Sequence, residues 1–283
     1  MKFSVIIVSL NAGDKLIKTV NSALSQKDVE FEIVIKDGHS KDGSLDAVRL
    51  LNDRRIRLFE QDDTGIYDGM NQAITHAEGD FFIFMNCGDY FYDESVLARF
   101  AEVAVKNGFN ESPDLGASSD KPEGLAASRP FIFYGSRYSR LTGSVEHISP
   151  KITPLVCYRN IPCHQAILYS RDNFEKRLYR PEYKVRADYE HFLWSVLKNN
   201  AKTVYVDHPV CIYEGGGYSE SPKAIKRSAE EHKEITHMYL TKWQLFYCRL
   251  YMILTLQPLR KRLASGRLSG LYNSFLRRLY HGG

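Results

Sequence analysis

Apolar and polar residues alternate along the first third of the chain in a pattern that predicts strands separated by helices. Short apolar runs predict strands at residues 3–10, 31–35, 56–60 and 80–85. Apolar residues at helical spacing predict helices between them, at residues 15–25, 44–51 and 66–76. This alternation indicates an α/β fold with a largely parallel sheet flanked by helices. The ligands of such sheets bind at the carboxyl ends of the strands.

The second half of the chain is less regular. Residues 110–130 are rich in Ser, Pro, Gly, Asp and Ala, and we expect a long surface loop there that is a candidate for disorder. Strands are predicted at residues 131–134, 166–169, 203–206 and 210–213, and a helix at residues 189–198. We therefore expect one domain over residues 1–220, with halves at 1–105 and 131–220, and a helical tail over residues 221–283.

Composition excludes several classes of protein. Hydrophobic residues make up 43% of the chain and charged residues 25%, which is ordinary for a globular protein and argues against disorder. The five cysteines are odd in number and have no CxxC spacing, so we expect neither a disulfide framework nor a thiolate zinc site. The apolar run at residues 3–10 ends at Asn11 without a cleavage pattern, which indicates a buried strand and not a signal peptide. A reduced, cytoplasmic location fits best.

Charge is distributed unevenly along the chain. After Glu234 there is no acidic residue, and eight Lys and Arg residues give the tail a charge of +8. Since the whole chain carries +4, residues 1–234 carry 4 − 8 = −4. Aromatic residues interleave with these bases, so we expect the tail to lie on an anionic membrane surface, with a solvated basic face as the alternative. No nucleic-acid motif accompanies the charge, and the oligomeric state is left open.

The first group of candidate site residues lies at two predicted strand ends. Ser9 and Asn11 end the first strand, and Asp37 and Gly38 follow the second. A carboxylate at this edge can accept hydrogen bonds from a nucleobase or a ribose. The competing interpretation is an ordinary strand–turn–helix in which Asp37 forms the turn, and from this segment alone it is favoured.

The second group contains Asp63, Asp68 and Asn71, followed by Asn86 and Asp89 after the fourth strand. A nucleotide sugar carries about two negative charges at its diphosphate, and a hard divalent cation with oxygen ligands can stabilise them. Asp89 could coordinate such a cation directly or through water. The alternative is a common surface turn.

The third group combines His164 with Asp188. A functional interpretation makes Asp188 the general base that deprotonates an acceptor hydroxyl, with Glu190 as its rival. The alternative makes Asp188 the cap of a helix that begins near Tyr189. His164 could equally be a histidine satisfied within a core or loop.

Together these segments resemble glycosyltransferase family 2. The resemblance covers residues 1 to about 220 and rests on residues 4–11, 33–44 and 65–71, with Gly79 ahead of the fourth strand. The colanic-acid, capsule and exopolysaccharide branch of the family is the most similar. Its recurring segments are matched by residues 164–166, 183–185, 187–189 and 216–219.

The resemblance implies a GT-A fold, a nucleotide-sugar donor, a Mn or Mg cation and inversion at the anomeric carbon. It further implies that Asp37 holds the base and ribose, Asp63 shapes the donor pocket, Asp89 binds the metal and Asp188 is the base. Ser9, Asn11, Gly38, Asp68, Asn71, Asn86 and His164 complete the expected binding set. The usual DxD motif is replaced by Asn86-Cys87-Gly88-Asp89, which leaves one carboxylate. Lys36, His39 and Ser136 also depart from the common pattern.

We therefore expect a glycosyltransferase that transfers a sugar onto a saccharide acceptor, lipid-linked, in the synthesis of a bacterial surface polysaccharide. It would act in the cytoplasm, at the inner face of the cell membrane. Glycines 215–217 would form a lid over the substrates or a simple turn. The alternative function is a catalytically silent GT-A module that binds or scaffolds. A nucleotidyltransferase or a dinucleotide oxidoreductase is disfavoured, because no Gly-rich phosphate loop follows the first strand.

Overall fold

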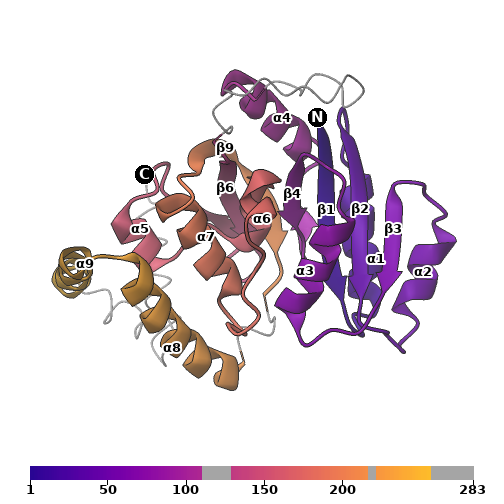
Figure 1. Cartoon of the computed structure of the whole chain (residues 1–283). Helices are drawn as coiled ribbons and strands as arrows, with labels where there is room; N and C mark the ends of the chain where they lie inside the picture. Colours follow the sequence, from indigo (N-terminus) through magenta and orange to yellow (C-terminus); the bar gives the residue numbers. More distant parts are fainter. Residues whose placement is uncertain (110–128, 216–220, 256–283) are drawn as a thin grey trace.

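The computed structural model describes residues 1–109, 129–215 and 221–255, and within them the chain forms one nine-stranded sheet with helices on both faces (Figure 1). The strands follow the order β3-β2-β1-β4-β8-β6-β9-β5, and β7 pairs with β6. Their bounds are β1 Lys2–Ser9, β2 Glu30–Asp37, β3 Ile56–Glu60, β4 Phe81–Phe84, β5 Tyr90–Phe91, β6 Phe131–Ser139, β7 Ser144–Glu146, β8 Ile167–Ser170 and β9 Lys202–Tyr213. Most of the expected surface loop, Gly216, Gly217 and the tail beyond residue 255 lie outside the described residues.

Strand direction brings the ends of distant segments to one edge of the sheet. β3, β2, β1 and β4 are parallel, and β8 is antiparallel to both β4 and β6. Because β8 reverses direction on each side, β6 and its parallel neighbour β9 run the same way as β1. The carboxyl ends of β1, β2, β4 and β9 therefore share an edge with the start of β8.

Helices cover the sheet in two layers, each with its own core. The helices are α1 Asp14–Leu24, α2 Ser44–Leu50, α3 Ile66–His76, α4 Val96–Lys106, α5 Pro154–Arg159, α6 Asp172–Glu175, α7 Ala187–Leu197, α8 Pro222–Tyr239 and α9 Lys242–Leu254. Apolar residues of α1, α2 and α4 pack with one face of the sheet, while those of α3, α7 and α8 pack with the other. Covering both faces explains why the central strands are apolar along their whole length.

The predicted mainly parallel α/β arrangement is confirmed, and the strand at 56–60 and the helix at 66–76 have the expected bounds. Other predicted bounds differ in detail, and the strand expected at 131–134 extends to Ser139. The strands expected at 203–206 and 210–213 are one strand, β9, because Pro209 falls where the ladder with β6 shifts register and its missing N–H is tolerated. The helix expected from residue 189 begins at Ala187, so Asp188 lies inside it.

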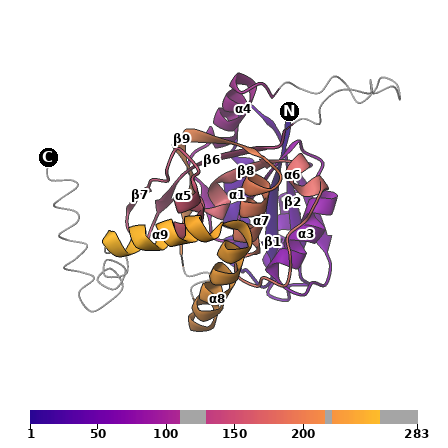
Figure 2. The same ribbon diagram turned by 60° about the vertical axis from the view of Figure 1, so that its left-hand side comes forward.

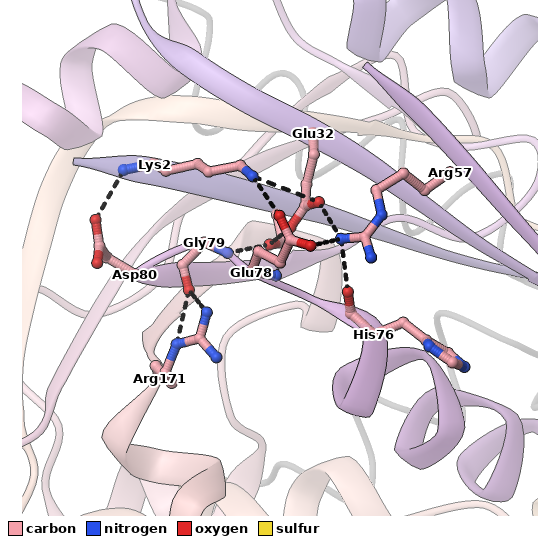
Figure 3. A network of polar contacts seen from close by, with 9 residues as sticks. Lys2, Glu32, Arg57, His76, Glu78, Gly79, Asp80 and Arg171 are labelled. Carbon is pink, nitrogen blue, oxygen red and sulfur yellow. Dashed lines mark hydrogen bonds and ion pairs between the residues drawn. The ribbon is translucent and has the colours of Figure 1, made fainter. Parts of the chain in front are cut away.

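The opposite, amino-terminal edge of the sheet is held by a network of charged side chains (Figure 3). Glu32 accepts hydrogen bonds from Ser4 Oγ at 2.7 Å and from Arg57 Nη1 at 2.8 Å. Arg171 donates to the carbonyl oxygen of Gly79 at 3.0 and 2.6 Å. A Cβ on Gly79 would lie 2.7 Å from the backbone nitrogen of Ser4, so only glycine allows this approach of the chain to β1.

Candidate active site

A cavity of about 420 Å³ opens at the carboxyl edge of the sheet. Four of the predicted site residues line it: Asn86, Asp89, His164 and Asp188. They come from the turn after β4, the short 3-10 helix His164–Ala166 before β8, and the start of α7. The volume lies within the range of small-molecule sites, which is roughly 300–1,000 Å³.

Asp89 is buried at the wall of this cleft. Its Oδ2 accepts a hydrogen bond from Gln165 Nε2 at 2.7 Å, and its Oδ1 accepts one from the backbone nitrogen of Glu214 at 3.0 Å. Burial raises the pKa of the Asp89 carboxyl to about 6, although both hydrogen bonds act in the opposite direction. Each carboxylate oxygen retains a further lone pair for another partner.

Asp188 points into the same cleft from the first turn of α7. Arg186 occupies the N-cap position of this helix, so the interpretation of Asp188 as the N-cap is wrong. Tyr67 Oη donates to Asp188 Oδ1 at 2.8 Å, and His164 Nδ1 lies 3.4 Å from Asp188 Oδ2. Burial lowers the pKa of His164, and the nearby Asp188 only partly opposes this shift. The imidazole of His164 and the phenol of Tyr67 therefore orient the carboxylate.

Glu190, the rival candidate for the base, is committed elsewhere. Its carboxylate is fully buried and accepts two hydrogen bonds from the Arg177 guanidinium, at 3.0 and 2.9 Å, together with one from Tyr239. It does not line the cleft. Two residues along a helix point in nearly opposite directions, which explains why Asp188 and Glu190 have different surroundings.

A second group of predicted residues gathers at the ends of β1 and β2. Asp37 is the last residue of β2 and accepts hydrogen bonds from the backbone nitrogen of Ser40 at 2.6 Å and from its hydroxyl at 2.7 Å. Asn11 Oδ1 accepts from the Lys41 nitrogen at 2.9 Å, and Gly38 donates to the Ser9 carbonyl at 2.9 Å. Ser9 is buried here, with its hydroxyl beside the Cys87 thiol.

Cys87 connects this second group with the cleft. It lines the cleft, and its thiol donates to the carbonyl oxygen of Val8 at 3.5 Å. Burial raises the pKa of the Cys87 thiol to about 11, and the negative charges of both Asp37 and Asp89 add to this shift. Both carboxylates are thus close enough to act on the same side chain.

The remaining predicted residues have structural contacts of their own. Asp63 pairs with the buried Lys36 behind the strand ends. Asp68 accepts a hydrogen bond from the Thr64 nitrogen at 2.8 Å and lines an adjoining hollow of about 270 Å³, which shares lining residues with the cleft. Asn71 does not line the cleft, and its amide bonds the backbone nitrogen and oxygen of Tyr179, both at 2.9 Å.

Asp89 and its surroundings bear on the expected cation. In the described residues no three His, Cys, Asp or Glu side chains come together as metal ligands. Glu214 is near enough for its charge to raise the pKa of Asp89, so some negative charge is gathered there. One carboxylate with free lone pairs fits a hard cation that takes most of its oxygens from a diphosphate and from water. It does not fit a cage built by the protein alone.

Several cleft residues were not singled out from the sequence. Tyr67, Arg137 and Glu214 all line it, and the guanidinium of Arg137 lies 4.5 Å from the centre of the Tyr213 ring. Tyr67 stands inside the segment 65–71 on which the family resemblance rests, so its position carried a usable signal. Arg137 belongs to β6 and Glu214 directly follows β9, and no motif marked either residue.

Comparison with known proteins settles the family. The family model described as "Glycosyl transferase family 2" matches residues 4–150, which is 147 of the 283 residues. The chain belongs to glycosyl transferase family 2. It is therefore a glycosyltransferase, and the family match includes Asp37 and Asp89 but ends before His164 and Asp188.

Relatives of this family member extend the likeness beyond residue 150. A "PGL/p-HBAD biosynthesis glycosyltransferase" of Mycobacterium bovis is 28% identical over 271 residues, covering 92% of this chain and 98% of the relative. The crystal structure of S. aureus TarS 1-349 in complex with UDP-GlcNAc has a TM-score of 0.61 at 18% identity, covering 85% of this chain and 72% of the other. The mannosyltransferase PcManGT from Pyrobaculum calidifontis, in complex with GDP-Man and Mn²⁺, has a TM-score of 0.55 at 14% identity, covering 99% and 88%. These likenesses confirm the GT-A fold.

Proposed function

We propose that this glycosyltransferase inverts the anomeric carbon as it moves a sugar from a nucleotide diphosphate sugar onto a saccharide acceptor. The observation that carries this proposal is the meeting of Asp89 and Asp188 in one cleft, beside the strand-end group around Asp37. Two structurally similar proteins hold UDP-GlcNAc or GDP-Man, which supports a donor of the same chemical class.

In the proposed reaction Asp188 removes the proton of the acceptor hydroxyl while that oxygen bonds to the anomeric carbon. The bond from the anomeric carbon to the diphosphate oxygen breaks on the opposite side, and the diphosphate leaves with the electron pair. Tyr67 and His164 hold the two oxygens of Asp188, so the carboxylate needs no reorientation during proton transfer.

The donor would lie along the strand ends, with Asp37 accepting hydrogen bonds from the base and ribose and Asp63 shaping the pocket through Lys36. Asp89 would hold Mn or Mg, which when bound would neutralise charge on the departing diphosphate. The Mn²⁺ in the complex of PcManGT supports a cation of this kind. Ser9, Asn11, Gly38, Asn86 and Asp68 remain proposed contributors to the donor side.

We further propose a lipid-linked acceptor at the cytoplasmic face of a membrane, in the synthesis of a surface polysaccharide such as those of the colanic-acid and capsule branch. The support comes from α9. Its large apolar side chains are exposed on one side of the helix, while Leu245 and Cys248 on the other side are buried. The exposed apolar side chains of α9 are those of Trp243, Phe246, Tyr247, Leu250, Ile253 and Leu254.

Charge complementarity favours an anionic bilayer as the partner of α9. The chain has eight Lys and Arg residues and no acidic residue after Glu234. Figure 2 shows α9 running along one side of the molecule near α5, where the Cys248 thiol lies 3.8 Å from the Pro154 carbonyl oxygen. In the described part of the chain, every helix is too short or too polar to cross a bilayer. The contact that we propose is between α9 and the surface of the bilayer.

Transfer assays test the reaction. Nucleoside diphosphates that raise the melting temperature in the presence of Mn identify the donor class, because a ligand that binds only the folded state stabilises it. With that donor, Asp188→Asn is expected to lower turnover by roughly 100- to 10,000-fold while nucleotide binding stays unchanged. Turnover close to that of the wild type would exclude Asp188 as the base. A wild-type protein that binds no sugar nucleotide would instead favour the silent binding module.

A further inference from the structure

A carboxylate on α8 captures the backbone of the segment that leads into α7. Glu231 is buried, and its Oε1 accepts a hydrogen bond from the backbone nitrogen of Lys184 at 2.9 Å. Its Oε2 accepts from the backbone nitrogens of Val185 at 3.1 Å and Arg186 at 2.9 Å. Three consecutive N–H groups on one carboxylate form an anion-binding concavity, here filled by a side chain of the same protein.

Neighbouring residues of α8 hold the same segment from both sides. Arg186 Nε donates to the Ser228 carbonyl at 2.9 Å and to its hydroxyl at 2.7 Å. Tyr183 Oη donates to Glu234 Oε1 at 2.8 Å. Residues 228, 231 and 234 are three apart and therefore share one face of the helix. The shape of the segment at residues 183–186 is thus set by a helix that follows it about 40 residues later in the chain.

This segment determines how Asp188 is held. The carbonyl oxygen of Val185 lies 2.8 Å from Tyr67 Oη, and the same hydroxyl lies 2.8 Å from Asp188 Oδ1. Because a phenol has a single proton, the two acceptors compete for it. Arg186 is also the N-cap residue of α7, directly ahead of the turn that carries Asp188. A displacement of residues 184–186 would therefore move both the phenol and the carboxylate.

We infer that Glu231 is a positioning residue for sugar transfer, acting through Val185 and Tyr67 on Asp188. The inference rests on the proposed function, since it takes Asp188 as the base. It also assigns α8 to the catalytic unit and not to a separate tail. Glu231 itself does not line the cleft, so its loss should change turnover and leave donor binding intact.

The central experiment compares Glu231→Gln with Glu230→Gln in the full chain. Both changes remove one negative charge from α8, but Glu230 is exposed and lies outside the contacts described above. Glu231→Gln turns an acceptor oxygen into an amide that opposes the backbone N–H groups, so kcat should fall about tenfold or more with donor KM within about twofold. Glu230→Gln should match the wild type in both parameters. A Glu231→Gln enzyme with wild-type kcat would overturn the inference.

A double-mutant cycle separates positioning from a general loss of structure. If Glu231 acts through Asp188, adding Glu231→Gln to Asp188→Asn should change the residual turnover by less than about threefold, because coupled residues are not additive. Additive losses would overturn the inference. Failure of the proposed function has another signature, since Asp188→Asn alone would then retain turnover.

Ser228→Ala keeps the test usable if Glu231→Gln does not fold. This smaller change removes one hydrogen bond to Arg186 and leaves the Ser228 carbonyl in place. It should lower kcat by about two- to fivefold without lowering the melting temperature by more than a few degrees. An unchanged kcat in this variant would count against control of Asp188 by α8.

Discussion

At the scale of single residues, Asp89 is the only carboxylate left from the usual pair of the family motif. Its Oδ1 and Oδ2 each have one donor from the protein, Glu214 and Gln165 respectively. We predict that Asp89→Asn lowers turnover at saturating Mn by about 100-fold or more, the equivalent of several kcal/mol of transition-state stabilisation. Calorimetric titration with the nucleoside diphosphate should show that Mn no longer strengthens binding.

The matched control for this change is Asp46→Asn, which neutralises an exposed carboxylate on α2. It should leave both turnover and the effect of Mn unchanged. If Asp89→Asn kept the full Mn dependence of the wild type, the cation would have to be held by other groups.

Gly79 has no Cβ, and the backbone of β1 packs against it at a distance that a Cβ would not allow. An added Cβ would approach the Ser4 nitrogen to 2.7 Å and the Phe3 carbonyl carbon to 2.8 Å, and neither backbone atom can move without shifting β1. Gly79→Ala is therefore expected to lower the free energy of unfolding by about 1–3 kcal/mol. Urea unfolding should show a lower midpoint with an unchanged slope. A midpoint equal to that of the wild type would mean that the backbone of β1 can shift to accommodate the added Cβ without a loss of stability.

At this scale the sequence identified candidate residues more reliably than the direction in which their side chains point. Asp188 and Glu190 were both plausible bases, and only the start of α7 at Ala187 determines which of them faces the cleft. Asn71 belongs to a specific motif, yet its amide is used by the backbone of Tyr179, more than 100 positions away. The contacts of Glu231 with residues 184–186 were invisible because they are made with backbone N–H groups, which no pattern of side chains can reveal.

At the scale of elements, the exposed side of α9 can be tested directly. We predict that the full chain co-sediments with vesicles containing anionic lipid and less with purely zwitterionic vesicles. Replacing Trp243 and Phe246 by Ser should weaken vesicle binding at least tenfold, since burying each large apolar side chain contributes roughly 1.5–3 kcal/mol. Because both side chains are exposed, the melting temperature should not change.

Leu50→Ser provides the comparison for this experiment. Leu50 is an exposed apolar residue on α2, at the other side of the molecule from α9 in Figure 1. Its replacement should leave vesicle binding as it was. Equal binding by the α9 variant and the wild type would show that this helix does not contact the bilayer.

Some elements long enough to establish a period were predicted, although α4, of eleven residues, was not, and several short elements were missed. The helix at 66–76 was found at its true bounds because its buried positions recur at helical spacing. The strand at 56–60 was also found at its true bounds, although its first four residues are only half-buried. β5, of two residues, and α6, of four, exist only through their tertiary neighbours and leave no periodic trace. The joining of two expected strands into β9 depends on the bulge opposite Ser136, which is likewise a property of the pairing.

At the scale of the whole molecule, two buried groups predict a loss of stability in acid. Burial lowers the pKa of His191 to about 3. As the pH falls below about 6.5, the imidazole therefore becomes protonated in the unfolded chain but stays neutral in the folded protein. Burial would raise the pKa of Glu32, but its hydrogen bonds with Arg57 and Ser4 outweigh this and lower it. The Glu32 contribution is present above the unfolded pKa of 4.5 and is lost as the pH falls through the lower folded value.

The His191 contribution begins to fall at a higher pH than that of Glu32. It decreases from about pH 6.5 downward by at most about 1.4 kcal/mol per pH unit, the value for one proton. Urea unfolding at pH 7.5, 6.5, 5.5 and 4.5 measures this slope. In His191→Phe the slope between pH 6.5 and 5.5 should be shallower by up to that amount, whatever the stability of the variant at pH 7.5. Parallel curves for the two proteins would contradict a neutral buried His191.

The hydrogen bonds from residues 184–186 to Glu231 form a clamp between that segment and α8. This clamp also limits where the chain can be cut. A fragment ending at residue 220, at the edge of the recognisable family pattern, would lose Glu231 and expose apolar positions that Ala224 and Ile235 now cover. Such a fragment would still contain the strand ends that we propose to bind nucleotide and yet be a poor catalyst. Chimeras that exchange C-terminal segments between relatives should therefore be joined after α8, so that the clamp and the loop it holds are inherited together.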